Sequence, residues 1–282
     1  MNFIELLRNA AQENNSIVCM GMDPSIERIP LQINDVEKKI TKFYADILGA
    51  AEAEKTKPGI VKPNYSFYAQ YGFPGLRALQ NVITECHKRK LLVILDAKRA
   101  DIGKTSEASA REAFDFWNAD AVTIAPYMGR DSITPFTEYC KKGKGVYILV
   151  RTSNIGALDL QSIEVDGKKL FMKTAELVSG DWFIEGAGAV VGATAPKELG
   201  EISTFFVKTG RTIPFLIPGV GTQGGTASEV VAELKKSNNE LAIHRINSSS
   251  GINYAYEHYK TGDYAGAAVK ALKALNKEIG FQ

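Results

Sequence analysis

The sequence has few cysteines and no long apolar segment, and these two shortages exclude several classes of protein. Its 282 residues include three cysteines, Cys19, Cys86 and Cys140, which lie far apart without a CxxC pair. Neither a disulfide framework nor a cysteine-ligated zinc site is indicated, and we expect a cytoplasmic protein. The first residues lack the apolar core of a signal peptide, and no apolar run approaches the roughly 18 residues of a membrane span.

An excess of charge of one sign is also missing. The chain has 34 basic and 32 acidic residues, which give a formal net charge of +2. Bulk attraction to nucleic acid or to a membrane surface is therefore not expected, and a bound anion must be held by a local site. The absence of GxSxG, HExxH and GxxxxGKS/T patterns removes support for a nucleophile-elbow hydrolase, a zinc protease and a P-loop enzyme.

The sequence does contain a regular alternation of short apolar runs with longer amphipathic segments. Eight runs predict strands, at residues 17–23, 59–64, 91–98, 121–126, 145–153, 189–193, 214–218 and 241–247. Helical patterns occupy residues 36–53, 75–90, 106–117, 170–179, 197–209, 227–236 and 264–279. Alternating strands and helices imply parallel strands joined by crossover helices. We predict one α/β domain, residues 1–282, folded as a TIM (β/α)8 barrel, with a doubly wound open sheet as the alternative.

The third run carries the strongest chemical signal. The apolar residues 91–95 are followed by Asp96-x-Lys98-x-x-Asp101. On a strand, Asp96 and Lys98 point to the same side, about 6 to 7 Å apart. Charges at the carboxyl end of a barrel strand lie where such folds keep their active sites. The spacing therefore predicts one pocket that both side chains face, and a surface salt bridge is the alternative.

Polar residues also end several of the other predicted strands. Asp23 follows the first run, Lys62 and Asn64 end the second, and Thr152, Ser153 and Asn154 end the fifth. In a barrel these positions converge at one mouth, which predicts a ligand site rather than a packing feature. A ring of salt bridges at the barrel mouth is the alternative interpretation.

A glycine-rich segment at residues 219–225, Gly-Val-Gly-Thr-Gln-Gly-Gly, follows the seventh run. Glycines let backbone N–H groups approach an anion, and the capping-box pattern Thr226-x-x-Glu229 starts a helix whose first amides favour phosphate. The same letters match GxGxxG, but that dinucleotide pattern belongs to a leading βαβ unit. In a barrel, the loops after strands seven and eight usually hold phosphate, so we predict a phosphate site. A glycine-rich turn without a ligand is the alternative.

Together these segments resemble one enzyme family. Residues 96–105, Asp-Ala-Lys-Arg-Ala-Asp-Ile-Gly-Lys-Thr, are similar to the DxKRxDIGxT pattern of orotidine 5′-phosphate decarboxylases of the longer bacterial and archaeal type. Residues 21–25, 61–64, 151–154 and 218–225 also match the family's segments in the same order, and we expect no attached phosphoribosyltransferase domain. The resemblance implies decarboxylation of orotidine 5′-phosphate to UMP, the last step of UMP biosynthesis, without a metal or organic cofactor.

The resemblance also implies roles for individual residues. Lys62, Asp96, Lys98 and Asp101 match the family's alternating charge network, in which Lys98 is the proton donor. Asp101 and Thr105 match residues that complete the neighbouring site of a homodimer. Asp23 matches a ribose contact, Ser153 a pyrimidine contact and Gln223 a phosphate contact. The substrate-binding residues implied are Asp23, Asn64, Ile102, Thr105, Thr152, Ser153, Pro218, Gly219, Gly221, Gln223, Gly224, Ser250 and Gly251.

One position departs from the family pattern. After the last strand, residues 247–252 read Asn-Ser-Ser-Ser-Gly-Ile, with Ser250 where the family usually has a phosphate-binding arginine. A bidentate, charge-assisted contact would then be missing. We expect substrate binding weaker by about 1.5 to 3 kcal/mol than in a relative with that arginine. Arg245 is close in sequence, but its place inside the predicted strand argues against compensation.

Two other functions stay open from the sequence. One is another phosphate-binding barrel decarboxylase, similar to the Mg²⁺-dependent 3-keto-gulonate 6-phosphate enzymes, because these also have a DxKxxD strand end. The other is a non-catalytic nucleotide sensor, which Ser250 makes more plausible. Sensitivity to a chelator separates the first from a metal-independent enzyme.

Overall fold

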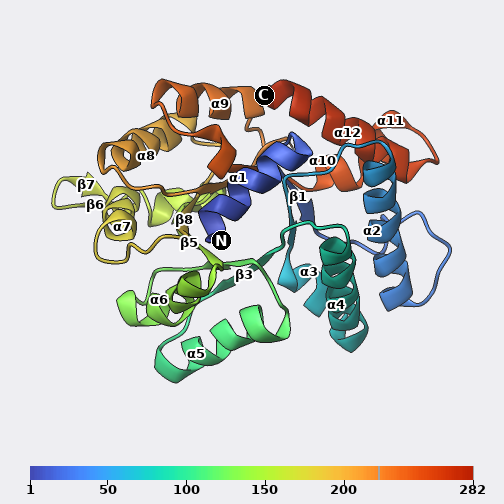
Figure 1. Cartoon of the computed structure of the whole chain (residues 1–282), viewed down its shortest axis with the longest axis horizontal. Helices are drawn as coiled ribbons and strands as arrows, with labels where there is room; N and C mark the ends of the chain where they lie inside the picture. Colours follow the sequence, from blue (N-terminus) through green and yellow to red (C-terminus); the bar gives the residue numbers. More distant parts are fainter. Residues whose placement is uncertain (222, 282) are drawn as a thin grey trace.

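Eight parallel strands form one sheet that curves into a barrel, with helices around its outside (Figure 1). The computed structural model describes residues 1–221 and 223–281. The strands are β1 (Val18–Met22), β2 (Ile60–Pro63), β3 (Ile94–Arg99), β4 (Ala121–Ile124), β5 (Gly145–Arg151), β8 (Ala187–Val191), β9 (Phe215–Ile217) and β10 (Arg245–Ser248). Their order is β2-β1-β10-β9-β8-β5-β4-β3, and parallel bridges join β2 to β3 at Val61–Val93 and Asn64–Asp96. The predicted TIM barrel is confirmed, and the open sheet is wrong.

Helices connect successive strands of the barrel, as expected for crossover connections, and further helices lie before the first strand and after the last. They are α1 (Phe3–Asn14), α2 (Val36–Ala53), α3 (Tyr65–Ala69), α4 (Gly72–Lys88), α5 (Gly103–Arg111), α6 (Arg130–Thr137), α7 (Leu170–Ser179), α8 (Pro196–Lys208), α9 (Ala227–Lys236), α10 (Ser250–Asn253), α11 (Ala255–Tyr259) and α12 (Tyr264–Ile279). Among the described residues, no helix is both long and apolar enough to cross a bilayer.

Some element boundaries differ from the predicted ones. The predicted third strand, residues 91–98, starts as β3 at Ile94, and the predicted last strand, residues 241–247, starts as β10 at Arg245 because residues 241–243 form a 3-10 turn. The helix predicted at residues 106–117 starts earlier, as α5 at Gly103, and continues after Arg111 as a π-helical turn. The sequence interpretation also missed five helices, α1, α3, α6, α10 and α11, and a short hairpin of β6 (Glu164–Val165) and β7 (Lys168–Lys169). Most of these elements are short and carry too few residues for a clear periodicity.

Alternate residues of the strands point into the barrel, where helix α1 closes one end (Figure 1). Phe3, Ile4 and Leu7 of α1 pack against inward-facing residues such as Cys19 and Tyr147. Helix α1 is amphipathic and begins with a capping box formed by Asn2 and Glu5. Because this apolar cluster fills the amino-terminal end of the barrel, we expect a ligand inside the barrel to bind at the opposite end, where the strands finish.

Arg245 lies inside the filled end and is fully buried. Its guanidinium donates to the carbonyl oxygens of Leu7 at 2.6 Å, His244 at 2.7 Å and Ala242 at 2.9 Å. Burial lowers the pKa of Arg245 to about 10. The side chain therefore ties β10 to α1 and does not line the cavity at the other end of the strands.

Candidate active site at the mouth of the barrel

A cavity of about 560 Å³ opens at the carboxyl ends of the strands. Ten of the predicted site residues line it: Asp23, Lys62, Asn64, Asp96, Lys98, Thr152, Ser153, Pro218, Gly219 and Gln223. Asn154, one of the polar residues that end the fifth predicted strand, lines it as well. The sequence interpretation missed other lining residues, of which Thr123, Asn247 and Ser249 are polar and Leu149, Val190 and Leu216 are apolar. The cavity thus brings together polar side chains from most strands of the barrel, as the convergence at one mouth predicted.

Asp96 lies between two lysines in this cavity. Its Oδ2 atom is 2.7 Å from Lys62 Nζ, and its Oδ1 atom is 2.6 Å from Lys98 Nζ. The side chains of Lys62 and Asp96 are 5% and 7% exposed, whereas that of Lys98 is 48% exposed. Lys98 is therefore the member of this row that presents an ammonium to an incoming ligand.

The two lysines keep Asp96 ionised. Burial opposes the charged form of Asp96, but the ammonium groups of Lys62 and Lys98 outweigh it and hold the pKa of this carboxyl well below its usual range. Burial also opposes the charged form of Lys62, but Asp96 and Asp23 raise the pKa of its ammonium above the ordinary value. The site therefore holds fixed charges of both signs at neutral pH.

The backbone at Lys98 has an unusual conformation that strict strand alternation did not predict. Its φ is 45°, in the left-handed region, and the pairing of β3 with β4 shifts register between Leu95 and Arg99. For a residue with a Cβ this costs on the order of 1 kcal/mol. The N–H of Lys98 donates to Thr123 Oγ1 at 3.0 Å, and this hydroxyl donates to Asp96 Oδ1 at 2.9 Å. Thr123 therefore ties the strained backbone to the carboxylate.

Thr123 was hidden in the sequence because it lies within an apolar run. One signal was available: in residues 121–124, Ala-Val-Thr-Ile, it is the polar position with the period of an inward-facing residue.

Asp23, which follows β1, is held by Ser249, which follows β10. Ser249 Oγ donates to Asp23 Oδ2 at 2.5 Å, while the buried Oδ1 of Asp23 has no hydrogen-bond partner within the described part of the chain. Gly21 permits this approach, because a Cβ there would lie 2.7 Å from the Cβ of Ser249. Asp23 Oδ1 is therefore available to accept a hydrogen bond from a ligand hydroxyl.

The glycine-rich segment after β9 forms a tight loop at the cavity edge. Gly219, Gly221 and Gly224 have φ values of 102°, 90° and 92°, which favour glycine. A Cβ on Gly219 would lie 3.0 Å from Ser153 Cβ and 3.2 Å from Gln223 Oε1, so this loop meets the end of β5. Thr222, within the predicted phosphate loop, lies outside the described residues.

The start of α9 differs from the predicted phosphate site. The capping contact is present, since Glu229 N–H donates to Thr226 Oγ1 at 3.3 Å. However, the N–H groups of Ala227 and Ser228 donate to Glu278 Oε1 at 2.8 and 3.1 Å. A carboxylate from α12 therefore occupies the first amides of α9, and the prediction that these amides are free for phosphate is wrong. The partner comes from a distant segment that local patterns do not reveal.

Seven predicted residues do not line this cavity: Asp101, Ile102, Thr105, Gly221, Gly224, Ser250 and Gly251. Asp101 follows β3, and its Oδ1 accepts from the N–H of Ile102 at 2.8 Å. Thr105 lies in α5, while Ser250 and Gly251 begin α10. The resemblance assigned Asp101 and Thr105 to a neighbouring subunit's site, so their absence from this cavity leaves that prediction standing.

Metal ligands do not gather in this structure: within residues 1–221 and 223–281, no three His, Cys, Asp or Glu side chains are grouped as they are around a metal ion.

Comparisons with known proteins agree with this arrangement. The sequence profile described as "Orotidine 5'-phosphate decarboxylase / HUMPS family" matches residues 16–276. An orotidine 5′-phosphate decarboxylase of Dechloromonas aromatica (strain RCB) is 41% identical over 257 residues, which cover 90% of this chain and 91% of the relative. One of Delftia acidovorans (strain DSM 14801 / SPH-1) is 38% identical over 288 residues, covering 99% and 98%.

Solved structures show the same relationship. The structure of Leishmania donovani OMP decarboxylase superposes with a TM-score of 0.78 at 30% identity and covers 99% of both chains. The profile match, the curated relatives and the superposition agree over nearly the whole length of the chain. The chain therefore belongs to the orotidine 5′-phosphate decarboxylase / HUMPS family.

Proposed function

We propose that this protein decarboxylates orotidine 5′-phosphate to UMP, the last step of UMP biosynthesis. The observation that carries the proposal is the Lys62–Asp96–Lys98 row inside the mouth of a barrel of this family. Breaking the bond from C6 to the carboxylate leaves an electron pair on C6 that the pyrimidine ring delocalises poorly. A fixed positive charge beside C6 stabilises that carbanion more than the ground state, which is what lowers a barrier.

Lys98 is the proposed source of this charge and of the proton. As CO2 leaves, its ammonium donates a proton to C6, and the resulting amine is reprotonated from water. Asp96 holds Lys98 Nζ at 2.6 Å, while Lys62 neutralises the other carboxylate oxygen at 2.7 Å. Asp96 would also lie near the departing carboxylate, so that loss of CO2 relieves a repulsion. This chemistry requires no metal or organic cofactor.

The other cavity residues are proposed to bind the rest of the nucleotide. Asp23 Oδ1, which is buried without a partner among the described residues, suits a ribose hydroxyl. Ser153 suits the pyrimidine, and Gln223 with the Gly219 loop suits the phosphate, because the loop meets the end of β5. Further residues proposed to form the substrate site are Asn64, Ile102, Thr152, Pro218, Gly221, Gly224, Ser250 and Gly251.

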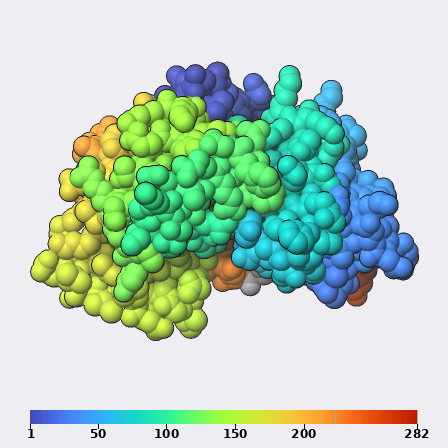
Figure 2. All heavy atoms as spheres, turned by 90° about the horizontal axis from the view of Figure 1, so that it is seen from below, coloured from blue at the N-terminus to red at the C-terminus, as the bar shows by residue number. Residues whose placement is uncertain are grey.

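A homodimer with shared sites is also proposed, with Asp101 and Thr105 completing the neighbouring site. Exposed apolar side chains support it: Phe73 is 78% exposed, Ile102 56%, Tyr127 81% and Met128 46%. They follow β2, β3 and β4, which are neighbours in the barrel. Figure 2 shows the segments from α3 to α6, cyan to green, beside one another on one face. Apolar surface gathered in one place is typical of a protein interface.

The function is tested by following the loss of orotate absorbance when the purified chain meets orotidine 5′-phosphate, with and without a chelator. We expect turnover that the chelator leaves unchanged and that Lys98→Ala nearly abolishes while thermal unfolding stays the same. Chelator-sensitive turnover of a sugar phosphate instead would favour the Mg²⁺-dependent decarboxylases. Tight nucleotide binding without any turnover would favour a sensor.

Shared sites are tested by mixing two inactive variants, Lys98→Ala and Asp101→Ala. A mixed dimer has one site with both substitutions and one site with neither, so random reassortment restores about a quarter of wild-type activity. No recovery after subunit exchange would contradict a site built from both subunits.

A further inference from the structure

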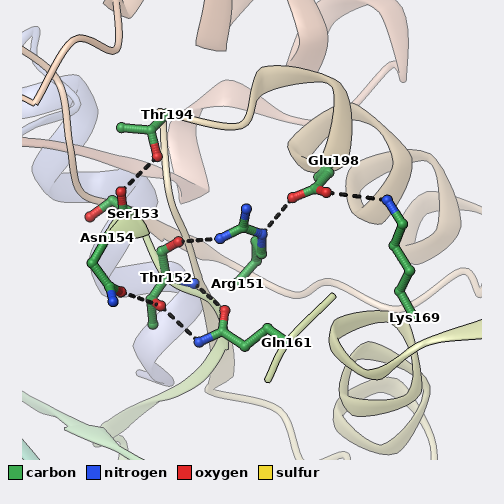
Figure 3. Close-up of polar contacts among 8 residues, drawn as sticks. All are labelled: Arg151, Thr152, Ser153, Asn154, Gln161, Lys169, Thr194 and Glu198. Carbon is green, nitrogen blue, oxygen red and sulfur yellow. Dashed lines mark hydrogen bonds and ion pairs between the residues drawn. The ribbon is translucent and has the colours of Figure 1, made fainter. Parts of the chain in front are cut away.

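A chain of hydrogen bonds orients the rim of the cavity at the end of β5 (Figure 3). It starts at Gln161, a half-buried residue between β5 and the β6–β7 hairpin. Gln161 Oε1 accepts from the N–H of Thr152 at 2.8 Å, and its Nε2 donates to Thr152 Oγ1 at 2.8 Å. Thr152 Oγ1 in turn donates to Asn154 Oδ1 at 2.7 Å. Both Thr152 and Asn154 line the cavity.

The direction of each bond follows from the one before it. A backbone N–H is a donor only, so it fixes which end of the Gln161 amide is the oxygen. The nitrogen end must then face Thr152 Oγ1, and this hydroxyl, having accepted, gives its own proton to Asn154 Oδ1. The carboxamide of Asn154 is thereby fixed as well, and its Nδ2 is left without a partner among the described residues. The rim of the cavity therefore offers a hydrogen-bond donor, rather than an acceptor, at Asn154.

The backbone of the same segment is anchored by other contacts. Arg151 donates to the carbonyl oxygen of Thr152 at 2.7 Å and pairs with Glu198 of α8, which also contacts Lys169 (Figure 3). Thr194 Oγ1 donates to the carbonyl oxygen of Ser153 at 2.9 Å. These contacts hold the main chain in place. The contact from Gln161 to the Thr152 hydroxyl therefore has a different role, which is to set the orientation of the Thr152 hydroxyl and of the Asn154 carboxamide.

We propose that Asn154 determines specificity by donating its Nδ2 hydrogen to an acceptor oxygen of the bound nucleotide, and that Gln161 and Thr152 are positioning residues that fix this direction. The inference rests on the proposed function. The oxygen belongs either to a carbonyl of the base or to the phosphate, since both are acceptors without a proton at neutral pH. Asp23 and Asp96 supply acceptors to the same cavity, so a donor at the rim complements them.

Gln161→Glu tests the direction of the hydrogen bonds from Gln161 through Thr152 to Asn154. The introduced carboxylate still accepts from the Thr152 N–H, but its second oxygen now takes the Thr152 hydroxyl proton. Asn154 then turns its Nδ2 towards Thr152 and presents its oxygen to the nucleotide. We expect KM for orotidine 5′-phosphate to rise about tenfold, with kcat within about twofold, because a hydrogen bond is replaced by a repulsion. Thr152→Val, which removes the hydroxyl without adding charge, is the neutral companion variant.

The charge introduced by Gln161→Glu can itself repel an anionic substrate, and Asn154→Ala separates the two effects. If the proposal holds, Gln161→Glu raises KM in the wild-type background and hardly at all in the Asn154→Ala background. Equal increases in both backgrounds, or none in the wild type, would overturn it. Unchanged thermal unfolding of the Gln161→Glu and Asn154→Ala proteins identifies the effect as one of orientation and not of folding.

Binding of fragments to the Asn154→Ala protein identifies the oxygen. A weaker affinity for UMP and uridine, with that for ribose 5-phosphate unchanged, assigns the donor to the base. A weaker affinity for UMP and ribose 5-phosphate, with that for uridine unchanged, assigns it to the phosphate. Unchanged affinity for all three would refute the contact. These measurements do not depend on turnover, so a failure of the proposed function, seen as a wild-type protein that does not decarboxylate the substrate, is distinguishable from a failure of this inference.

Discussion

Lys62 and Lys98 contact the same carboxylate, but we expect removal of Lys62 to reduce mainly stability and removal of Lys98 to reduce mainly activity. Lys62→Met deletes a charge that is buried with its partner, since the two side chains are 5% and 7% exposed at a distance of 2.7 Å. Breaking a buried pair costs about 3 to 5 kcal/mol. We expect a loss of about 3 kcal/mol in the free energy of unfolding, at the low end of that range, because Lys98 and Thr123 still contact Asp96 Oδ1.

Lys98→Met is the matched control. Its ammonium is 48% exposed, so solvent screens the contact to Asp96, and the expected loss is at most about 1 kcal/mol. Its effect on decarboxylation is expected to be far larger, because no other ammonium of the row faces the open cavity. Urea denaturation of both variants, alongside the orotate assay, measures the contrast. Equal destabilisation by the two substitutions would refute the assignment of Lys62 to structure and Lys98 to chemistry.

The buried ion pair of Lys62 and Asp96 also predicts how the free energy of unfolding depends on pH. The folded-state pKa of Asp96 lies below its unfolded value of about 3.9, so the ionised carboxylate contributes stability above that value and loses it as the pH falls towards the folded pKa. The stability difference between wild type and Lys62→Met should therefore be constant from about pH 7 to pH 5 and shrink below about pH 4. A difference in stability between wild type and Lys62→Met that grows as the pH falls would contradict this prediction.

Three further substitutions test other features. Ser250→Arg is expected to lower KM for orotidine 5′-phosphate by about tenfold or more, the effect of one charged hydrogen bond, and an unchanged KM would count against a phosphate near Ser250. Arg245→Ala removes three hydrogen bonds and leaves a cavity, so we expect a loss of about 3 kcal/mol in the free energy of unfolding and faster amide hydrogen exchange in α1. Slow exchange in α1 would show that this helix stays docked without Arg245. Glu278→Ala exposes the first amides of α9 and should cost about 1 kcal/mol in urea denaturation, whereas Glu278→Gln should retain part of it.

Local patterns were enough to predict the barrel and much of its mouth. The ranges of α2, α7, α9 and α12 match their predicted residues, because each has an apolar stripe of helical period over ten or more residues. Asp96 and Lys98 were expected in one pocket from their spacing alone, and both line the cavity. Such features depend on residues within a few positions of one another, and this is the range over which a sequence pattern carries information.

Tertiary structure decided the partners of these residues. Ser249 reaches Asp23 across 226 positions, Glu278 caps α9 across 51, and Thr123 contacts Asp96 across 27. Lys98 adopts its left-handed backbone at a register shift between two strands. These contacts depend on which strands and helices become neighbours and on how they are aligned. The sequence by itself therefore determined many of the groups that gather at the mouth of the barrel. The pairing of distant strands determined which of these groups touch, because hydrogen bonds form only at the distances that packing sets.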